Sequence, residues 1–137
     1  VKAALSEVKS NLENGNAYQK FLDMVKYQKG DIDKIAVSTK VHSIRSNKTG
    51  YINKINALKI GNLVKQLGGG RIEKDDLLDL GVGVLLNKKV GDYVLENEEL
   101  LKVYYGKNDI KVQDVLNCFE IDLVPDDKKP LIHEVIK

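Results

Sequence analysis

The sequence is poor in cysteine, proline and aromatic residues, and it contains no long apolar run. Its 137 residues include one cysteine, two prolines and no tryptophan. The single cysteine, Cys118, excludes an internal disulfide, and its apolar neighbours predict a buried core residue rather than a nucleophile. No apolar run approaches the roughly 18 residues of a membrane span, and the N-terminus lacks the pattern of a secretory signal. We therefore expect a cytoplasmic protein with no membrane partner.

The sequence does contain enough apolar material for one core. Its hydrophobic fraction is 42%, and its length is typical of about one domain. It shows no internal repeat and no low-complexity segment. The chain also begins with a valine, which, together with the short apolar helices described below, suggests a piece of a larger protein.

Positive charge is concentrated in the middle of the chain. Residues 40–75 carry eight bases and two acids, whereas residues 76–137 carry eight bases and thirteen acids. A basic segment of this kind could attract nucleic acid. However, these bases are spaced singly through the predicted strand, helix and loop, and no aromatic cluster accompanies them. We therefore expect no nucleic-acid partner.

The first thirty residues predict two short helices. The first has apolar residues at helical spacing and stops at Gly15, and the second ends at residues 28–31. The apolar positions are Ala4, Leu5, Val8 and Leu12, then Ala17, Phe21, Met24 and Val25. Two such helices can bury little against each other, so their apolar faces are expected to pack on something else. Residues 31–40 have no clear period and are interpreted as a linker.

The rest of the chain, residues 41–137, predicts a mixed domain of the α+β class. Strands are expected at 41–46 and 51–55, joined as a hairpin by the turn 47–50. A helix follows and stops at the glycines 68–70. Further strands are expected at 82–86, from 93, and at 100–105, with a helix at 109–119. Two apolar runs, 121–124 and 131–136, flank a charged turn that bears Pro125 and Pro130.

Several spaced motifs resemble the pyrimidine and thymidine nucleoside phosphorylases. They are Gly50-Tyr51-Ile52, Ile55, Ala57 and Ile60-Gly61; then Leu67-Gly68-Gly69-Gly70-Arg71 with Lys74-Asp75; then Asp79, Val82-Gly83-Val84, Leu86, Lys88 and Val90-Gly91-Asp92. The first thirty residues are similar to the end of the catalytic domain of that family, through Gly15, Ala17, Phe21, Met24-Val25, Gln28 and Gly30-Asp31. Lys29 and Gly69 depart from the family pattern, where glycine and alanine are more usual.

The resemblance implies a C-terminal α/β hammerhead domain over 41–137, related to barrel-sandwich hybrids. Residues 1–30 would then be the helical tail of the catalytic region. It also implies a pentosyltransferase reaction, in which phosphate attacks a pyrimidine nucleoside to give the free base and a pentose 1-phosphate. The groups that bind phosphate and base lie upstream in this family. We therefore expect this chain to be inactive alone, to carry no catalytic, metal or cofactor site, and to pair with its own catalytic lobe in a cytoplasmic enzyme that is a homodimer at full length.

The glycine run is the one candidate for a role near substrate. Gly68, Gly69, Gly70 and Arg71 could wrap an anion with backbone N–H groups, since glycine permits close approach. However, this run follows a helix C-terminus, where the dipole disfavours an anion. Helix termination with a mobile loop is the favoured interpretation, and a lid at the mouth of the active site is the functional alternative.

The other chemically interesting residues favour structural roles. His42 and His133 lack an identifiable partner for acid–base chemistry and are interpreted as surface or strand-packing residues. The acids Asp75, Asp76 and Asp79 match no calcium loop and are interpreted as a solvated face.

Two alternative functions remain open at this point. Residues 89–94 and 99–101 also resemble half of a biotinyl or lipoyl carrier domain. Such carriers display a modifiable lysine on a tight hairpin, commonly beside methionine, and the only methionine here is Met24. A lysine-linked cofactor in the mass spectrum would identify a carrier. The second alternative is a non-catalytic interaction module, which would bind a partner other than its own catalytic lobe.

Overall fold

The computed structural model of the chain describes residues 2–127, 130, 132 and 134–136. The contacts divide the chain into two compact units, Val1–Ala36 and Val37–Lys137. Within the described residues, no helix has both the length and the apolar character needed to cross a membrane.

The first unit is a pair of short helices. α1 spans Lys2–Glu13 and α2 spans Asn16–Tyr27, and a short 3₁₀ helix, η1, follows at Ile32–Lys34. Gly15 separates the two helices in a left-handed conformation, with φ of 83°. Both expected helices are confirmed. Among the described residues of α1 and α2 none is buried; Leu5, Val8, Leu12, Phe21 and Met24 are exposed, and Ala17 and Val25 are half-buried.

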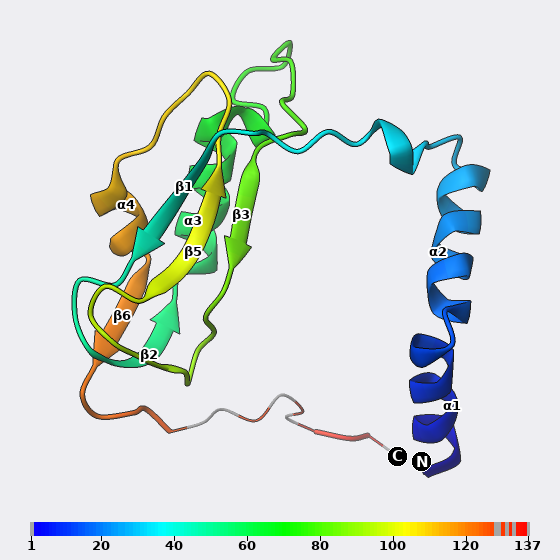
Figure 1. Cartoon of the computed structure of the whole chain (residues 1–137), viewed down its shortest axis with the longest axis horizontal. Coiled ribbons are helices and arrows are strands. Elements are labelled where there is room, and N and C mark those ends of the chain that lie inside the picture. The colour runs from blue at the N-terminus through cyan, green and yellow to red at the C-terminus, as the bar shows by residue number, and fades with distance from the viewer. Residues whose placement is uncertain (1, 128–129, 131, 133, 137) are drawn as a thin grey trace. The chain divides into compact units, whose positions relative to one another are not determined.

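The second unit contains two small antiparallel sheets and belongs to the α+β class. One sheet has the order β1 (Val41–Arg45), β5 (Glu99–Tyr104), β3 (Gly83–Leu86), and the other has the order β4 (Tyr93–Val94), β2 (Gly50–Ile55), β6 (Phe119–Asp122). Figure 1 shows α3 (Ala57–Val64) and α4 (Val112–Leu116) beside the strands. The helix α3 widens into a π-helical turn, η2 (Lys65–Gly69).

The predicted hairpin between residues 41–46 and 51–55 is wrong. β1 pairs with β5, and β2 pairs with β4 and β6, so the two strands belong to different sheets. The reason lies in the connection. Ser46 is buried, and its backbone N–H and C=O bond to Glu98 and Asn97, each at 2.8 Å. Gly50 then lies so close to β6 that a Cβ atom there would approach the Asp122 carbonyl oxygen to 2.5 Å. The segment therefore crosses between sheets instead of reversing.

The predicted helix at 109–119 is shorter in the structure. α4 covers only Val112–Leu116, and Phe119 already begins β6. The backbone N–H of Asn56 donates to the carbonyl of Cys118 at 2.8 Å, and Phe119 pairs with Ile55. These strand contacts end the helix earlier than the apolar spacing predicts. The later apolar run at 131–136 includes residues 131 and 133, which lie outside the described residues.

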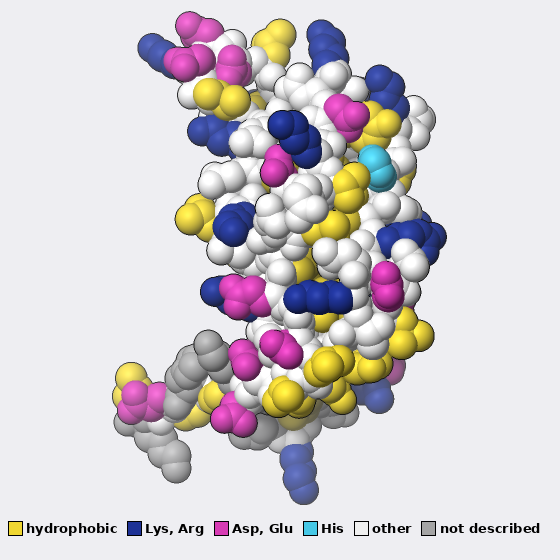
Figure 2. Space-filling view, turned by 90° about the vertical axis from the view of Figure 1, so that its left-hand side faces the viewer, with side chains coloured by type: hydrophobic (Ala, Val, Ile, Leu, Met, Phe, Trp, Pro, Cys, Tyr) yellow, Lys and Arg dark blue, Asp and Glu magenta, His cyan; other side chains and the backbone are white. Residues whose placement is uncertain are grey.

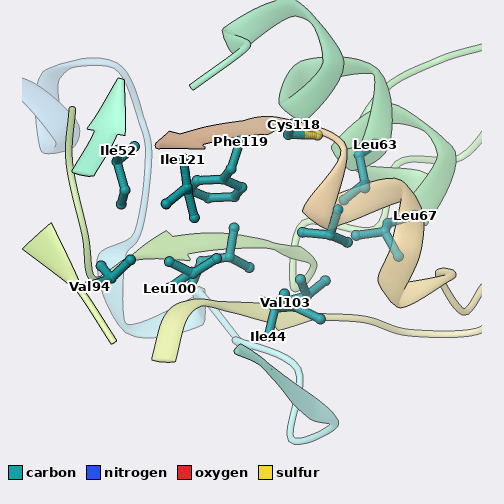
Figure 3. Close-up of a cluster of buried hydrophobic side chains, with 12 residues drawn as sticks. Ile44, Ile52, Leu63, Leu67, Val94, Leu100, Val103, Cys118, Phe119 and Ile121 are labelled. Atoms are coloured by element: carbon teal, nitrogen blue, oxygen red, sulfur yellow. The ribbon is translucent and has the colours of Figure 1, made fainter. Parts of the chain in front are cut away.

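One apolar core joins the two sheets and the helices of the second unit. Figure 3 shows Leu100, Phe119 and Ile121 pointing toward one another between the sheets, with Leu63 and Leu67 approaching from α3 and η2. The buried apolar residues are Ile44, Ile52, Leu63, Leu67, Val94, Leu100, Leu101, Val103, Val115, Cys118, Phe119 and Ile121. Every strand of the unit except β3 contributes at least one of them, so the two sheets are stabilised together.

Candidate functional site

The candidate site is the glycine turn, defined here as residues Gly68, Gly69, Gly70 and Arg71. It begins inside η2, the π-helical turn that continues α3. The side chain of Asn56 caps the start of α3 by accepting the backbone N–H of Lys59 at 3.0 Å, and Leu63 and Leu67 bury the inner face of the helix. Gly68 then adopts φ of +104°, a left-handed conformation that a side chain disfavours. The turn is therefore held by a capped and well-packed helix on its N-terminal side.

Close packing accounts for the next two glycines. A Cβ atom at Gly69 would lie 2.8 Å from the Val64 side chain and 3.1 Å from its carbonyl oxygen. A Cβ atom at Gly70 would lie 3.0 Å from Cγ of Lys65. The chain can fold back over the last turn of the helix because neither residue has a side chain. This agrees with helix termination as one role of these glycines.

The acids that follow the turn bind backbone N–H groups. One carboxylate oxygen of Asp76 accepts the N–H groups of Ile72 at 2.9 Å and Glu73 at 2.8 Å. These two bonds, from Glu73 first, hold the pKa of Asp76 below its ordinary value. Asp79 donates its backbone N–H to the carbonyl of Gly68 at 2.9 Å. Asp76 and Asp79 therefore stabilise the loop, and among the described residues no group of three or more His, Cys, Asp or Glu side chains is arranged for a metal ion.

His42 and Cys118 are distant from the glycine turn in sequence, and the contacts of both residues are structural. His42 is half-buried on β1, directly opposite Val103 of β5. His133 lies outside the described residues. Cys118 is 2% exposed, as the sequence predicts, and its thiol donates to the Asp114 carbonyl at 3.3 Å. Burial raises the pKa of this thiol above 9.0. Cys118 is therefore a core residue.

The turn that resembles a carrier hairpin lies between β3 and β4. Lys88 forms an ion pair with Glu98 at 2.5 Å, and its side chain is 24% exposed. The backbone N–H of Lys89 is held by the Asp92 carboxylate at 2.8 Å. Lys88 is thus engaged in a contact between turns, whereas a carrier needs its lysine free for modification.

Basic and acidic side chains are interspersed on the surface. On the face drawn in Figure 2, lysine and arginine side chains alternate with aspartate and glutamate side chains. Within the basic segment, Lys54 on β2 pairs with Glu120 on β6 at 2.9 Å.

A contact that the sequence does not indicate joins Ser38 to Tyr105, the residue after β5. The hydroxyl of Ser38 donates to the carbonyl of Tyr105 at 2.5 Å, and its backbone N–H donates to the carbonyl of Gly81 at 2.8 Å. Ser38 and Tyr105 are 67 residues apart. No local pattern signals such a contact, because it depends on the pairing of β1 with β5.

Comparisons with known proteins agree on one family. Residues 51–122, just over half of the chain, match the family model described as the pyrimidine nucleoside phosphorylase C-terminal domain. The pyrimidine-nucleoside phosphorylase of Staphylococcus haemolyticus strain JCSC1435 is 34% identical over 91% of this chain. Enzymes of the same name from Staphylococcus epidermidis strain ATCC 12228 and Staphylococcus aureus strain bovine RF122 show the same identity and coverage. The chain spans 30% of the length of each of these relatives. It belongs to the pyrimidine nucleoside phosphorylase family, and the part that the family model matches is the C-terminal domain.

Proposed function

We propose that this chain is the C-terminal structural part of a pyrimidine nucleoside phosphorylase, a pentosyltransferase of nucleoside metabolism. The whole enzyme would convert a pyrimidine nucleoside and phosphate into the free base and a pentose 1-phosphate. The observation that carries this proposal is the match of residues 51–122 to the C-terminal domain of the family, together with relatives of that name that are much longer. The groups that bind phosphate and base would lie upstream, so this chain alone would be inactive and would need no cofactor.

We also propose that residues 41–137 form an α/β hammerhead domain of the barrel-sandwich type. The two antiparallel sheets around one core support this assignment. Residues 31–40 would be the linker. Residues 1–30 would be the helical tail of the catalytic region in this division.

The partner of this chain would be the catalytic lobe of its own protein. The exposed apolar side chains of α1 and α2 support a contact with a further protein surface: Leu5, Val8, Leu12, Phe21 and Met24 are between 43% and 69% exposed. An apolar helix face of this kind is stable in water only when it is small or covered. The full-length enzyme would be a cytoplasmic homodimer.

The experiment that tests the proposed function uses the full-length protein from the same source. We expect phosphate-dependent release of uracil from uridine, of thymine from thymidine, or of both. A version that lacks residues 37–137 is expected to lose this activity. Failure of the folded full-length protein to act on either nucleoside would overturn the proposal.

The glycine turn would act as a lid at the mouth of the active site. Its glycines support this role because residues without a side chain give the backbone the conformational freedom that a closing loop needs. Deleting Gly69 and Gly70 in the full-length enzyme should lower kcat/KM by about tenfold or more, since small misplacements near a reacting centre are costly. Gly61→Ala, in α3, is the matched control because a Cβ atom there meets open space. Unchanged turnover and substrate affinity in the deletion variant would exclude the lid.

A further inference from the structure

A continuous series of hydrogen bonds leads from the glycine turn to the segment by which the chain enters the second unit. The Gly68 carbonyl accepts the backbone N–H of Asp79 at 2.9 Å. The Asp79 carboxylate accepts the backbone N–H of Gly81 at 3.0 Å. The Gly81 carbonyl accepts the backbone N–H of Ser38 at 2.8 Å, and Ser38 is the second residue of the unit.

Hydrogen bonds also join the entering segment to the residues just after β5. The Ser38 hydroxyl donates to the Tyr105 carbonyl, and the ammonium group of Lys40 donates to the Gly106 carbonyl at 3.2 Å. Tyr105 donates its own backbone N–H to the carbonyl of Lys40 at 3.1 Å. The entering segment is therefore fixed to the central strand of one sheet and, through Gly81, to the loop that carries Asp79.

Asp79 is the residue on which this series depends. Its backbone N–H donates to the Gly68 carbonyl, and its carboxylate holds the backbone N–H of Gly81 two residues later, so it fixes the loop between Gly68 and Gly81, the partner of Ser38. Its carboxylate also fills the space over Gly106, because a Cβ atom on Gly106 would collide with Oδ2 of Asp79. A Cβ atom on Gly68 would meet Cβ of Asp79 at 3.5 Å.

We propose that Asp79 is a positioning residue that links the glycine turn to the entering segment at Ser38. The functional meaning of this link rests on the proposed lid role, since a change in the path of the entering chain would then reach the lid through Asp79. The link itself is a property of the second unit and needs no substrate. It is absent from the sequence pattern because the residues that form it come from four separate parts of the chain.

Amide hydrogen exchange of the 137-residue chain, resolved by NMR, tests the link. In Asp79→Ala, the amides of Gly81 and Ser38 should exchange about five- to tenfold faster, which is the effect expected for loss of one hydrogen bond. Asp79→Asn should leave both rates unchanged, because its amide oxygen can accept the same bond. The buried amide of Leu101 reports on global unfolding.

A second variant disturbs the cluster without changing residue 79. Gly106→Ala should displace the carboxylate and accelerate the same amides, whereas Gly83→Ala should not, because a Cβ atom there meets open space. If the Leu101 amide also accelerates in Asp79→Ala, Gly106→Ala decides. Unchanged exchange at Ser38 in Gly106→Ala, or an effect of Asp79→Asn equal to that of Asp79→Ala, would overturn the proposal. If the exchange pattern holds but Asp79→Ala leaves kcat/KM of the full-length enzyme unchanged, the link itself stands. Its proposed functional meaning, which depends on the lid, is then excluded.

Discussion

At the scale of single residues, the core of the second unit depends on side chains that are fully enclosed. Ile52 on β2 is 0% exposed, and Figure 3 shows it beside Ile121 of the neighbouring strand β6. Leu58 on α3 is 74% exposed and serves as a natural contrast. Removal of a buried side chain costs both the transfer free energy of the lost groups and the cavity that remains.

Truncation of Ile52 should therefore destabilise the protein strongly. We expect Ile52→Ala to lower the free energy of unfolding by about 2–5 kcal/mol, and Leu58→Ala to change it by about 0.5 kcal/mol or less. Urea unfolding followed by circular dichroism measures both values. Equal effects of the two substitutions would show that the core is not where the structure places it.

The turn at 72–76 should respond to acid. The hydrogen bonds that the Asp76 carboxylate accepts from the backbone N–H groups of Glu73 and Ile72 hold the pKa of Asp76 below the ordinary value of 3.8. A lowered pKa in the folded state means that the carboxylate stabilises the turn above pH 3.8, and that this contribution is lost as the pH falls through the lower folded value. An NMR titration of the Asp76 carboxyl carbon should give a midpoint below 3.8. A midpoint at or above that value would contradict the two bonds.

At the scale of elements, the end of η2, which continues α3, is set by backbone conformation. Gly68 has φ of +104°, whereas Gly61, seven residues earlier, lies in α3 and a Cβ atom added there would meet open space. Position 68 therefore favours glycine, whereas position 61 can accept a side chain.

Alanine at these two positions should change stability in opposite directions. Gly68→Ala should lower the free energy of unfolding by about 1–2 kcal/mol, because a side chain disfavours the left-handed conformation. Gly61→Ala should raise it by about 0.5–1 kcal/mol, because alanine is the better helix former. Thermal unfolding of both variants measures the difference. A stabilising Gly68→Ala would mean that the turn is not left-handed.

Elements whose signals are local could be predicted from the sequence. The spacing of Ala4, Leu5, Val8 and Leu12 identified α1, and the glycines after Leu67 identified the end of η2, which continues α3. Strands β3 and β5 were predicted within one residue or so of their observed ends. In each of these cases the pattern and the structure depend on the same few neighbouring residues.

Pairing could not be predicted in the same way. The alternation in 41–46 and 51–55 indicates strands, but it says nothing about which strand lies opposite. The partner of β1 is set by Leu101 and Val103, about 60 residues away, and the end of α4 is set by the pairing of Phe119 with Ile55. The residues of the candidate turn were found from sequence because glycines mark it. Its link to Ser38 was missed because that link depends on these distant pairings.

At the scale of the whole chain, the two units differ in how much they bury. The described residues of α1 and α2 include none that is buried, whereas the second unit contains the complete apolar core. The stability of the chain should therefore reside almost entirely in Val37–Lys137.

A shortened chain, Val37–Lys137, should fold by itself. We expect a single cooperative unfolding transition with a free energy within about 1 kcal/mol of that of the 137-residue chain. Chemical denaturation of the two chains side by side gives the comparison. A shortened chain without a cooperative transition would show that the first unit is part of the folded core.

The central proposal is that this chain is part of a phosphorylase whose chemistry lies upstream of it. Phosphorolysis of uridine and thymidine by the purified 137-residue chain tests it most directly, with the full-length protein assayed under the same conditions. We predict phosphate-dependent release of the base by the full-length protein and none by the chain, at any concentration at which it remains folded. Release of base by the chain itself would contradict this prediction and place a catalytic site within these residues.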